Sequence, residues 1–471
     1  MSTSICSSNL TSGFIDLATY DEQEKYLYGG PDAVAYFVRE IRKATWFTQV
    51  PVCLSSRSGQ PGFGQQWSVS ISRAGDYLLH TWLSLQIGAV ALTGAANNPL
   101  PGPQNGDRLL RWSRNLAHNL VQECAITFND LVAARFDNYH LDFWAAFTVP
   151  ESKKDGYNKM IGNLPELTNP AASQLGVNAA PSLPAVKLNL PLPFFFSRDS
   201  GMALPTAALP YNEMRISFAF RNLSDLLTVD TYNGASWTSA PVQQNQVTGA
   251  DLSNVNVWAN YAIVSNDERK KMACAPRDIL IEQVQTAPTQ NLSGSAPQYD
   301  IRFSHSIKAL FWACRNKSVS SCWSNYSDQN SVPSPVSGLV DPLLGANPLD
   351  NTSLIYENTQ RLYQMPSDYF GLVNPWFHAP TIPHGENIGY NMYSYSLDFF
   401  AIDPMGSTNY GKLTNVSIIP QASAGVQAAL AVALNAANVA NNSAQRYDFI
   451  TCAVNNNIIR ISGGALGFPV L

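Results

Sequence analysis

Residues 188–220 constrain the fold more than any other stretch of the 471-residue chain. Over residues 211–220 polar and apolar side chains alternate, with Met214, Ile216 and Phe218 on one face, which predicts a half-buried strand. Prolines at positions 191, 193, 205 and 210 precede it, and proline neither donates a hydrogen bond inside a sheet nor continues a helix. The stretch therefore predicts short extended segments that end in a strand. Within it we expect residues 194–196 to pack in a core and Arg198 to form a local ion pair with Asp199.

The strand has an echo near the C-terminus. Residues 212–217 read N-E-M-R-I-S and residues 457–462 read N-I-I-R-I-S, so four of six positions are identical. Two alternating strands could match by chance, or each half of the chain could close on the same kind of last strand. A chain of 471 residues exceeds what one core usually serves, so two domains are expected. We predict an arm with a short helix at 1–32, a first domain at 33–224, a polar linker at 225–254 and a second domain at 255–471.

The remaining pattern is that of an all-β protein. Runs bounded by turn residues predict strands at 36–38, 46–54, 65–72, 77–87, 123–128, 255–264, 279–285, 299–314, 354–356, 390–400, 413–419, 447–454 and 458–461. Short helices are expected from Thr19 or Asp21, at 140–147, and at 265–273 with Ser265 and Glu268 as a capping box. Residues 424–440 are too interrupted to span a membrane and predict a loop or surface helix. Short strands with long excursions at 88–106 and 317–351 indicate two tandem antiparallel eight-stranded jelly rolls.

Composition limits the kinds of partner that the protein is expected to bind. Charged residues make up 13% of the chain, against about a quarter in ordinary soluble domains, so much of the surface is expected to be covered by partners. The formal charge of −5 argues against nucleic-acid binding, and the basic cluster at 269–271 reads as a solvated helix end. Seven cysteines, at 6, 53, 124, 274, 314, 322 and 452, form no C-x-x-C pair, and no secretory signal is evident. Reduced thiols of a protein made in the cytosol are therefore expected.

No pattern for catalysis is present. The histidines, at 80, 118, 140, 305, 378 and 384, include no H-x-H or H-E-x-x-H, and no nucleophile elbow or phosphate-binding loop occurs. We therefore predict no catalytic, cofactor-binding or metal site. Two alternatives remain open: a glycosidase, whose two carboxylates need only spatial proximity, and a carbohydrate-binding jelly roll. Trp312, Trp323, Tyr326 and Trp376 could stack on sugars, although burial in cores or subunit contacts explains such aromatics more simply.

Five motifs give the chain a specific resemblance that covers essentially its whole length. They are S-G-F-I-D-L-A-T at 12–19, F-G-Q-Q-W-S-V-S-I-S-R-A-G-D-Y-L-L at 63–79, L-P-L-P-F-F-F-S-R-D-S-G-M-A-L-P at 190–205, G-S-T-N-Y-G-K-L-T-N at 406–415 and N-N-I-I-R-I-S-G-G-A-L-G-F-P-V-L at 456–471. In these motifs the sequence resembles the major capsid proteins of large double-stranded DNA viruses, most closely those of iridoviruses. The resemblance implies a double jelly roll, a homotrimeric capsomer of pseudo-hexagonal outline, and an icosahedral shell over an internal membrane, assembled in the host cytoplasm.

The resemblance also implies roles for the segments that carry no motif. Loops 88–106 and 317–351 would be outward-facing towers, and residues 1–32 an inward arm that touches minor capsid proteins or the membrane. Partners would be two further copies, neighbouring capsomers and minor capsid proteins, with no direct contact to nucleic acid. Contacts inside the trimer are expected to be large and apolar, above about 2,000 Å². Contacts between capsomers can be smaller and polar because each is repeated many times.

Overall fold

The computed structural model describes residues 3–35, 37–38, 40–94, 96–340, 345–383, 385 and 387–468. It contains two compact units, Met1–Trp46 and Phe47–Leu471, which are described separately. The first unit holds α1 (Thr3–Ala18) and α2 (Glu22–Tyr28). The predicted helix start at Asp21 is confirmed, since the Asp21 side chain accepts a hydrogen bond from the Glu22 N–H and the Glu24 carboxylate accepts one from the Asp21 N–H. In the described part of the chain, no helix has the length and apolar character needed to cross a membrane.

The second unit begins with a sandwich of two antiparallel sheets, the first jelly roll. One sheet has the order β1-β16-β4-β10, and its strands are β1 (Phe47–Cys53), β16 (Leu252–Val264), β4 (Tyr77–Ile87) and β10 (Val186–Pro191). The other has the order β2-β3-β12-β7-β8, with β2 (Ser55–Ser58), β3 (Gln66–Ser70), β12 (Met214–Phe220), β7 (Val121–Phe128) and β8 (Leu131–Asp137). The inward faces close a core in which Val69, Leu83, Ile126, Ile216 and Val257 are buried. The predicted alternation of β12 is confirmed, because its burial alternates residue by residue.

Long connections of this jelly roll carry further structure. Two small sheets have the orders β14-β13-β6 and β15-β5-β9, from β14 (Trp237–Pro241), β13 (Leu227–Tyr232), β6 (Arg108–Trp112), β15 (Val247–Thr248), β5 (Val90–Leu92) and β9 (Ser182–Leu183). The α-helices are α3 (Leu116–Leu120), α4 (Asn138–Thr148), α5 (Glu151–Ile161), α6 (Pro165–Thr168), α7 (Ala171–Gln174) and α8 (Leu223–Leu226). Short 3₁₀ turns and one bridge strand, β11 (Leu204–Pro205), lie between β10 and β12. The predicted helix at 140–147 is confirmed as α4.

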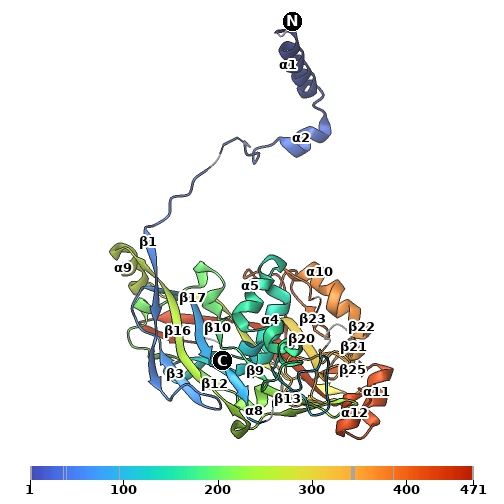
Figure 1. Ribbon diagram of the computed structural model, residues 1–471. Helices are drawn as coiled ribbons and strands as arrows, with labels where there is room; N and C mark the ends of the chain where they lie inside the picture. Colours follow the sequence, from blue (N-terminus) through green and yellow to red (C-terminus); the bar gives the residue numbers. More distant parts are fainter. Residues whose placement is uncertain are drawn as a thin grey trace. The chain divides into compact units, whose positions relative to one another are not determined.

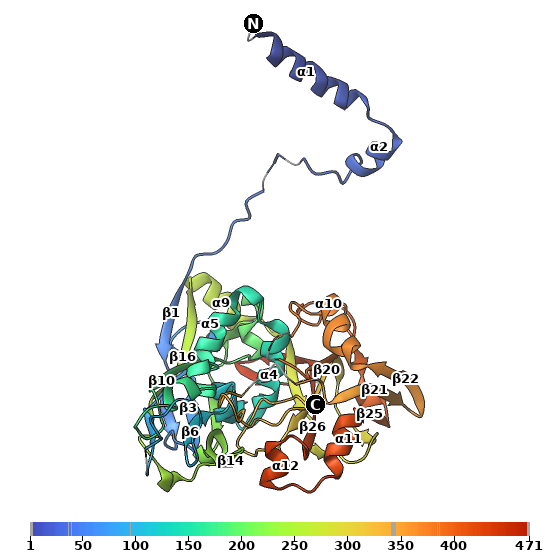
Figure 2. The ribbon, with the colours of Figure 1, turned by 45° about the vertical axis from the view of Figure 1, so that its right-hand side comes forward.

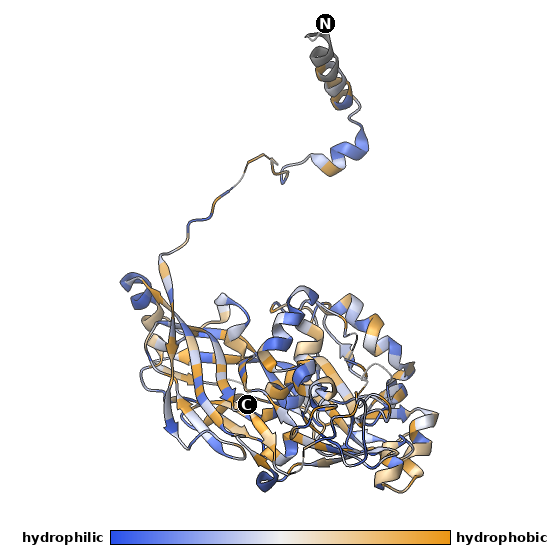
Figure 3. Ribbon diagram, in the orientation of Figure 1, coloured by the Kyte–Doolittle hydropathy of each residue, from blue (hydrophilic) through white to orange (hydrophobic). Residues whose placement is uncertain are grey.

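The second jelly roll follows α9 (Asn266–Cys274). One sheet has the order β17-β26-β20-β23, from β17 (Arg277–Thr286), β26 (Tyr447–Ser462), β20 (Ser306–Asn316) and β23 (Asn391–Ser394). The other has the order β19-β25-β21-β22, from β19 (Tyr299–Asp300), β25 (Val416–Ala422), β21 (Leu349–Tyr356) and β22 (Thr359–Pro366). The short π-helix η6 (Tyr369–Val373) leads into α10 (Asn374–His378). Of the loop or surface helix expected at 424–440, the structure forms two helices, α11 (Ala424–Ala431) and α12 (Ala436–Ala440). Figures 1 and 2 show the two jelly rolls side by side. Helix α9, labelled at the upper left of Figure 1, is coloured strongly hydrophilic at the same place in Figure 3.

The two jelly rolls repeat one topology. We count the first as β1, β3, β4, β7, β8, β10, β12 and β16, and the second as β17, β19, β20, β21, β22, β23, β25 and β26. In both, one sheet has the order first, eighth, third, sixth, and the other second, seventh, fourth, fifth. Consecutive strands thus alternate between the facing sheets, except that the fourth and fifth form a hairpin in one sheet, and this is the winding of a jelly roll. The chain is all-β with two tandem jelly rolls, as predicted.

Strand pairing corrects the predicted division of the chain. Residues 225–254 were expected to be a linker, yet they contain α8, β13, β14 and β15, which pack on first-half strands. Residues 255–264 were expected to open the second jelly roll, yet β16 pairs with β1 and β4. The echo is also reinterpreted: residues 212–217 enter the seventh strand of one jelly roll and residues 457–462 end the eighth strand of the other. The idea that β12 closes the first jelly roll is wrong, because β16 does.

Two smaller predictions also change. At 36–38 a strand was expected; Tyr36 lies outside the described residues, and Phe37 and Val38 are not in a strand. Ser265 is the N-cap residue of α9, but its side chain makes no capping hydrogen bond, so the capping box with Glu268 is not formed. The dihedral angles of Ser265 suit a cap without its hydroxyl being used.

Candidate assembly surfaces and the seam between the jelly rolls

An apolar seam joins the two jelly rolls. Helix α4, in the connection between the fifth and sixth strands of the first jelly roll, is started by Asp137, whose carboxylate accepts from the His140 N–H at 2.9 Å. Its Phe143 and Phe147 are fully buried against Phe311 of β20, with ring centroids 5.8 and 5.5 Å from it. The same cluster takes in residues of β26, among them Ile450, Cys452 and Val454. The outer face of β20 and β26 is therefore covered by a helix of the other jelly roll.

The edge strand β17 strengthens this seam. It packs beside β8, and the Gln283 side chain donates to the Ala133 carbonyl oxygen at 2.8 Å. Ile281 of β17 and Ile459 and Ile461 of β26 belong to the hydrophobic core of the first jelly roll. The two jelly rolls thus share buried surface as parts of one body.

A buried ion cluster crosses the seam. Lys308 Nζ lies 2.5 Å from one carboxylate oxygen of Glu282 and 2.6 Å from the Ala401 carbonyl oxygen, and the Arg198 guanidinium pairs with the other oxygen. All three charged side chains are more than nine-tenths buried. Burial lowers the pKa of Lys308 to about 8 and the pKa of Arg198 to about 10, so both remain charged at neutral pH. Arg198 also lies over the ring of Phe400, 4.6 Å from its centroid.

This cluster corrects the expectation for residues 198 and 199. Arg198 does not pair with Asp199; its partner is Glu282, far along the chain on β17. The Asp199 carboxylate instead accepts a hydrogen bond from the Gly201 N–H at the start of a 3₁₀ turn. Residues 194–196 are buried in the first core, so their predicted packing is confirmed.

Asp142 of α4 is the hub of a second buried group. Its carboxylate oxygens lie 3.0 Å from Asn115 Nδ2, 2.8 Å from His118 Nδ1, 2.7 Å from Ser324 Oγ and 2.9 Å from the Tyr326 hydroxyl. Two of these partners come from the first jelly roll and two from the connection after β20. A carboxylate with four hydrogen bonds is compensated for its burial, so it holds that connection in place.

His118 links Asp142 to a further residue of this buried group. His118 Nδ1 faces the carboxylate, and Nε2 lies 2.7 Å from the Tyr157 hydroxyl, so both ring nitrogens are engaged. His140 is buried too, and burial lowers its pKa to about 3. Within the described residues no group of three His, Cys, Asp or Glu side chains could hold a metal ion; His384 lies outside them.

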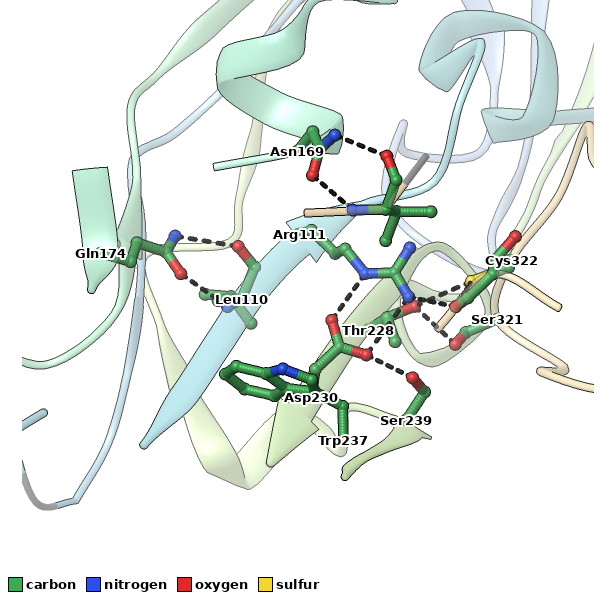
Figure 4. A network of polar contacts seen from close by, with 12 residues as sticks. Leu110, Arg111, Asn169, Gln174, Thr228, Asp230, Trp237, Ser239, Ser321 and Cys322 are labelled. Atoms are coloured by element: carbon green, nitrogen blue, oxygen red, sulfur yellow. Dashed lines mark hydrogen bonds and ion pairs between the residues drawn. The ribbon is translucent and has the colours of Figure 1, made fainter. Parts of the chain in front are cut away.

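A third buried network ties the same connection to the small sheet β14-β13-β6 (Figure 4). Arg111 Nε and Nη2 donate to the two oxygens of Asp230 at 2.6 and 3.2 Å, and Nη2 also donates to the Ser331 carbonyl at 2.7 Å. Burial opposes the charge on Arg111, but the adjacent Asp230 carboxylate outweighs it and raises the pKa of Arg111. Thr228 and Ser321 share a hydrogen bond of 2.7 Å. Asn169 makes two hydrogen bonds with the backbone of residue 340, at 2.7 and 2.9 Å.

Trp323 completes the contact. Its indole lies between two guanidinium groups, 3.6 Å from that of Arg221 and 3.4 Å from that of Arg315, and its Nε1 donates to the Asp225 carbonyl at 2.8 Å. Burial lowers the pKa of Arg221 to about 10. The face of the aromatic ring attracts both cations and so offsets part of the cost of their burial.

These contacts bear on two predictions. Residues 321–334 are buried or half-buried, whereas residues 335–337 and 339 are exposed. Loop 88–106 is held by Asn97, whose side chain donates to the Arg108 carbonyl oxygen and accepts from the Arg108 N–H; residues 95 and 341–344 lie outside the described residues. Among the four proposed stacking aromatics, Trp312 and Tyr326 are buried, Trp323 is enclosed, and only Trp376 is exposed. The structure thus does not gather them into a sugar-binding platform.

Two apolar surfaces stay open on the second unit. The first, the open sheet face, is the outer side of β1-β16-β4-β10, where register places two rows of residues: Cys53, Trp258, Trp82 and Pro191, and Pro51, Asn260 and His80. The second, the α10 ridge, is formed by Leu372, Val373, Trp376 and Phe377. Trp376 and Phe377 are each 71% exposed, which is unusual for large aromatics.

Comparison with known proteins gives one consistent result. The family model described as major capsid protein N-terminus matches residues 35–264, and that described as large eukaryotic DNA virus major capsid protein matches residues 268–467. The two matched ranges are separated by residues 265–267, at the junction of β16 and α9, where the strand pairing also divides.

The chain is similar to curated relatives along its full length. It is 60% identical to the major capsid protein of Costelytra zealandica iridescent virus, with 99% of this chain and 100% of the relative covered. Identity is 57% to that of Invertebrate iridescent virus 6, with coverage of 99% and 100%, and 45% to that of Lymphocystis disease virus 1, with both chains fully covered.

Solved structures agree on the fold. A chain of the PBCV-1 virus capsid superposes with a TM-score of 0.67 at 19% identity, covering 93% of this chain and 100% of that one. The Faustovirus major capsid protein gives 0.68 at 12% identity, covering 92% and 93%.

Proposed function

The chain belongs to the family of major capsid proteins of large eukaryotic DNA viruses, and from that premise we propose that it forms homotrimers that tile an icosahedral shell. As a member of this family it is a structural component of the virion capsid. One observation carries the trimer: a single chain repeats the same eight-strand order twice. Three such chains bring six similar lobes around one axis, and a pseudo-hexagonal capsomer packs among six neighbours.

The seam supports this role. Buried aromatic contacts, the Arg198–Glu282–Lys308 cluster and the Asp142 hub join the lobes into one body. A subunit whose lobes are fixed relative to one another presents its contact surfaces in a constant geometry, which a closed shell requires. The work of this protein is therefore binding, and we assign it no catalytic step.

Finer partner assignments are part of the same proposal. Neighbouring capsomers and minor capsid proteins are the expected further partners. Residues 1–32 form an arm in which Leu10, Phe14 and Leu17, spaced four and three residues apart on α1, make an exposed apolar row, and such a row suits a minor protein or the surface of an internal membrane. The cysteines at 53, 124, 274, 314, 322 and 452 are free thiols, which accords with assembly in the host cytoplasm. We draw the boundary of the two jelly rolls at α9.

Light scattering of the purified protein tests the proposal. We expect three times the chain mass of 51.4 kDa at micromolar concentration, and electron microscopy should show particles of hexagonal outline. A stable monomer at that concentration contradicts the trimer. A glycan array serves as the control for the binding-module alternative, and no retained glycan is expected.

A further inference from the structure

Inside one chain, a helix of the first jelly roll covers a sheet of the second. Helix α4 lies between the fifth strand, β8, and the sixth, β10, and its Phe143 and Phe147 cover β20 and β26. These two strands are the third and eighth of the second jelly roll. The contact therefore has a topological description: the helix after strand five packs on the outer face of strands three and eight of the next lobe.

The second jelly roll has a helix at the equivalent place. Helix α10 follows the fifth strand, β22, and precedes the sixth, β23, beside which it packs. On α4 the large aromatics Phe143 and Phe147 are fully buried by the neighbouring lobe, whereas on α10 Trp376 and Phe377 are exposed. One chain offers no third lobe for α10 to cover.

Within the described part of the second unit, no helix covers the equivalent sheet face of the first jelly roll as α4 covers that of the second. Its third and eighth strands are β4 and β16, and the open sheet face lies on their outer side. Trp82 and Trp258 stack there across the strands, with ring centroids 6.3 Å apart and planes 11° from parallel. None of the seven residues that define this face is Asp, Glu, Lys or Arg, although the exposed Lys187 lies on the same side of β10, four residues before Pro191. Depletion of charge with enrichment of aromatics marks the core of a protein interface.

A cleft borders this face. It has a volume of about 660 Å³, and its lining includes His80 and Trp82 of β4, Trp144 of α4, Met160 of α5 and Phe400. Apolar side chains dominate the lining, so large aromatic side chains would be its natural occupants. The cleft is therefore a recess that the protruding aromatic rings of the α10 ridge can enter.

We propose that the α10 ridge of one copy docks on the open sheet face of a second copy, repeating between chains the contact that α4 makes within each chain. The occupant of the face is thus a second copy of this protein. The contact joins two different surfaces, so it is head-to-tail, and such contacts form rings when the rotation closes. The inference rests on the proposed trimer and adds which surfaces form it.

Substitutions on both sides test the contact. We expect Trp376→Ala combined with Phe377→Ala to weaken the trimer by about 30-fold or more, because central aromatics dominate interface energetics. His80→Glu, which places a charge on the opposite surface, should weaken it similarly. Tyr363→Ala on β22 is the matched control, since Tyr363 is an exposed aromatic outside both surfaces, and it should leave the mass unchanged. Circular dichroism confirms that each variant is folded.

Crosslinking supplies an independent readout. Two tagged variants of different size, one with His80→Cys and one with Phe377→Cys, are co-expressed in a background in which Cys6, Cys53 and Cys274 are serine. A short bismaleimide should join one chain of each kind, whereas Tyr363→Cys with His80→Cys should give no product.

The outcomes separate this inference from the proposed function. A monomeric wild type overturns both. A wild-type trimer that survives the Trp376 and Phe377 substitutions, with no crosslink between positions 80 and 377, overturns only the assignment of surfaces. Loss of the trimer in these variants, together with the crosslink, supports the assignment.

Discussion

The outer faces of two equivalent sheets differ in what covers them. On β17-β26-β20-β23, the residues of β20 are buried on both sides of the strand, because the core lies below and α4 above. On β1-β16-β4-β10, β4 keeps an outward row with the exposed His80 and the half-exposed Trp82. Strands with the same place in the same topology therefore differ in sequence: β20 is largely apolar on both faces, whereas β4 is largely apolar on its inner face only. The residue pattern of a strand thus indicates what covers each of its faces.

The covered face depends on the seam, and Glu282→Gln should damage the seam most. The variant leaves Arg198 and Lys308 buried without a counter-charge, and breaking a buried pair costs about 3–5 kcal/mol. A fall in the urea midpoint at fixed protein concentration measures it. Asp278→Asn on the same strand is the control, because its pair with Arg460 is exposed and should change the midpoint little. Equal shifts in the two variants would contradict a buried seam.

Phe311→Ala and His80→Ala compare the stability contributed by the covered face with that contributed by the open face. Phe311 is fully buried between the second jelly roll and α4, so its removal should cost about 3–4 kcal/mol of unfolding free energy. His80 occupies the open face, and its removal should shift the stability of the isolated subunit by less than about 0.5 kcal/mol. Denaturation monitored by tryptophan fluorescence compares the two. A large effect at His80 in protein that light scattering shows to be monomeric would mean that the open face is covered within the chain.

A change in the Figure 4 network tests the contact between the excursions of the two lobes. Asp230→Asn removes the charge that faces Arg111 but keeps the shape, and Arg111 retains its bond to the Ser331 carbonyl, so we expect about 3 kcal/mol, the lower end of the cost of breaking a buried ion pair. Segment 331–340 should then become sensitive to limited proteolysis, beginning near the exposed Val336. Ser239→Ala removes a lesser partner of the same carboxylate and should leave the digestion pattern unchanged. Cleavage at an unaltered rate in Asp230→Asn would show that other contacts hold the segment.

The smallest expected effect is a pH dependence at the end of the first jelly roll. Burial alone would raise the pKa of Asp76, but hydrogen bonds from the Arg269 side chain and the Val264 N–H outweigh it, so the pKa of Asp76 is lowered. A carboxyl with a lowered folded-state pKa stabilises the fold above its unfolded value of about 4, and this stability is lost as pH falls through the folded-state pKa. Asp76→Asn should therefore flatten the loss of thermal stability below pH 4. An unchanged acid profile would assign that loss to other carboxylates.

Much of the fold could be predicted from local pattern, since alternation and turn residues located most strands and both jelly rolls. The boundary between the jelly rolls could not be predicted, because residues 225–254 are rich in Thr, Gln and Asn and resemble a linker. In the structure Asp230 of this segment is fully buried, and its pair with Arg111 compensates the charge. The similarity of residues 212–217 to residues 457–462 led to a wrong boundary, because any half-buried strand alternates in this way, whatever its place in a sheet.

The seam was only partly visible in the sequence. The helix that bears Phe143 and Phe147 was expected, but its partner strands were not, because contacts across lobes leave no local spacing. Arg198 illustrates this point. Its neighbour Asp199 suggested an ion pair, while Glu282 was too distant in sequence for any pattern to connect the two.

The connection after β20 also has a consequence for synthesis. The first jelly roll is complete in sequence at Val264, but Asp142 then lacks Ser324 and Tyr326, and Phe143 still lacks Phe311. A chain that leaves the ribosome from its N-terminus must therefore hold α4 partly unsatisfied while residues 265–326 are made, and Ile450, Cys452 and Val454 of β26 cover the helix later still. Nascent chains of this protein gain a finished first lobe only after much of the second has emerged, so a truncated product carries an exposed apolar helix that marks it as incomplete.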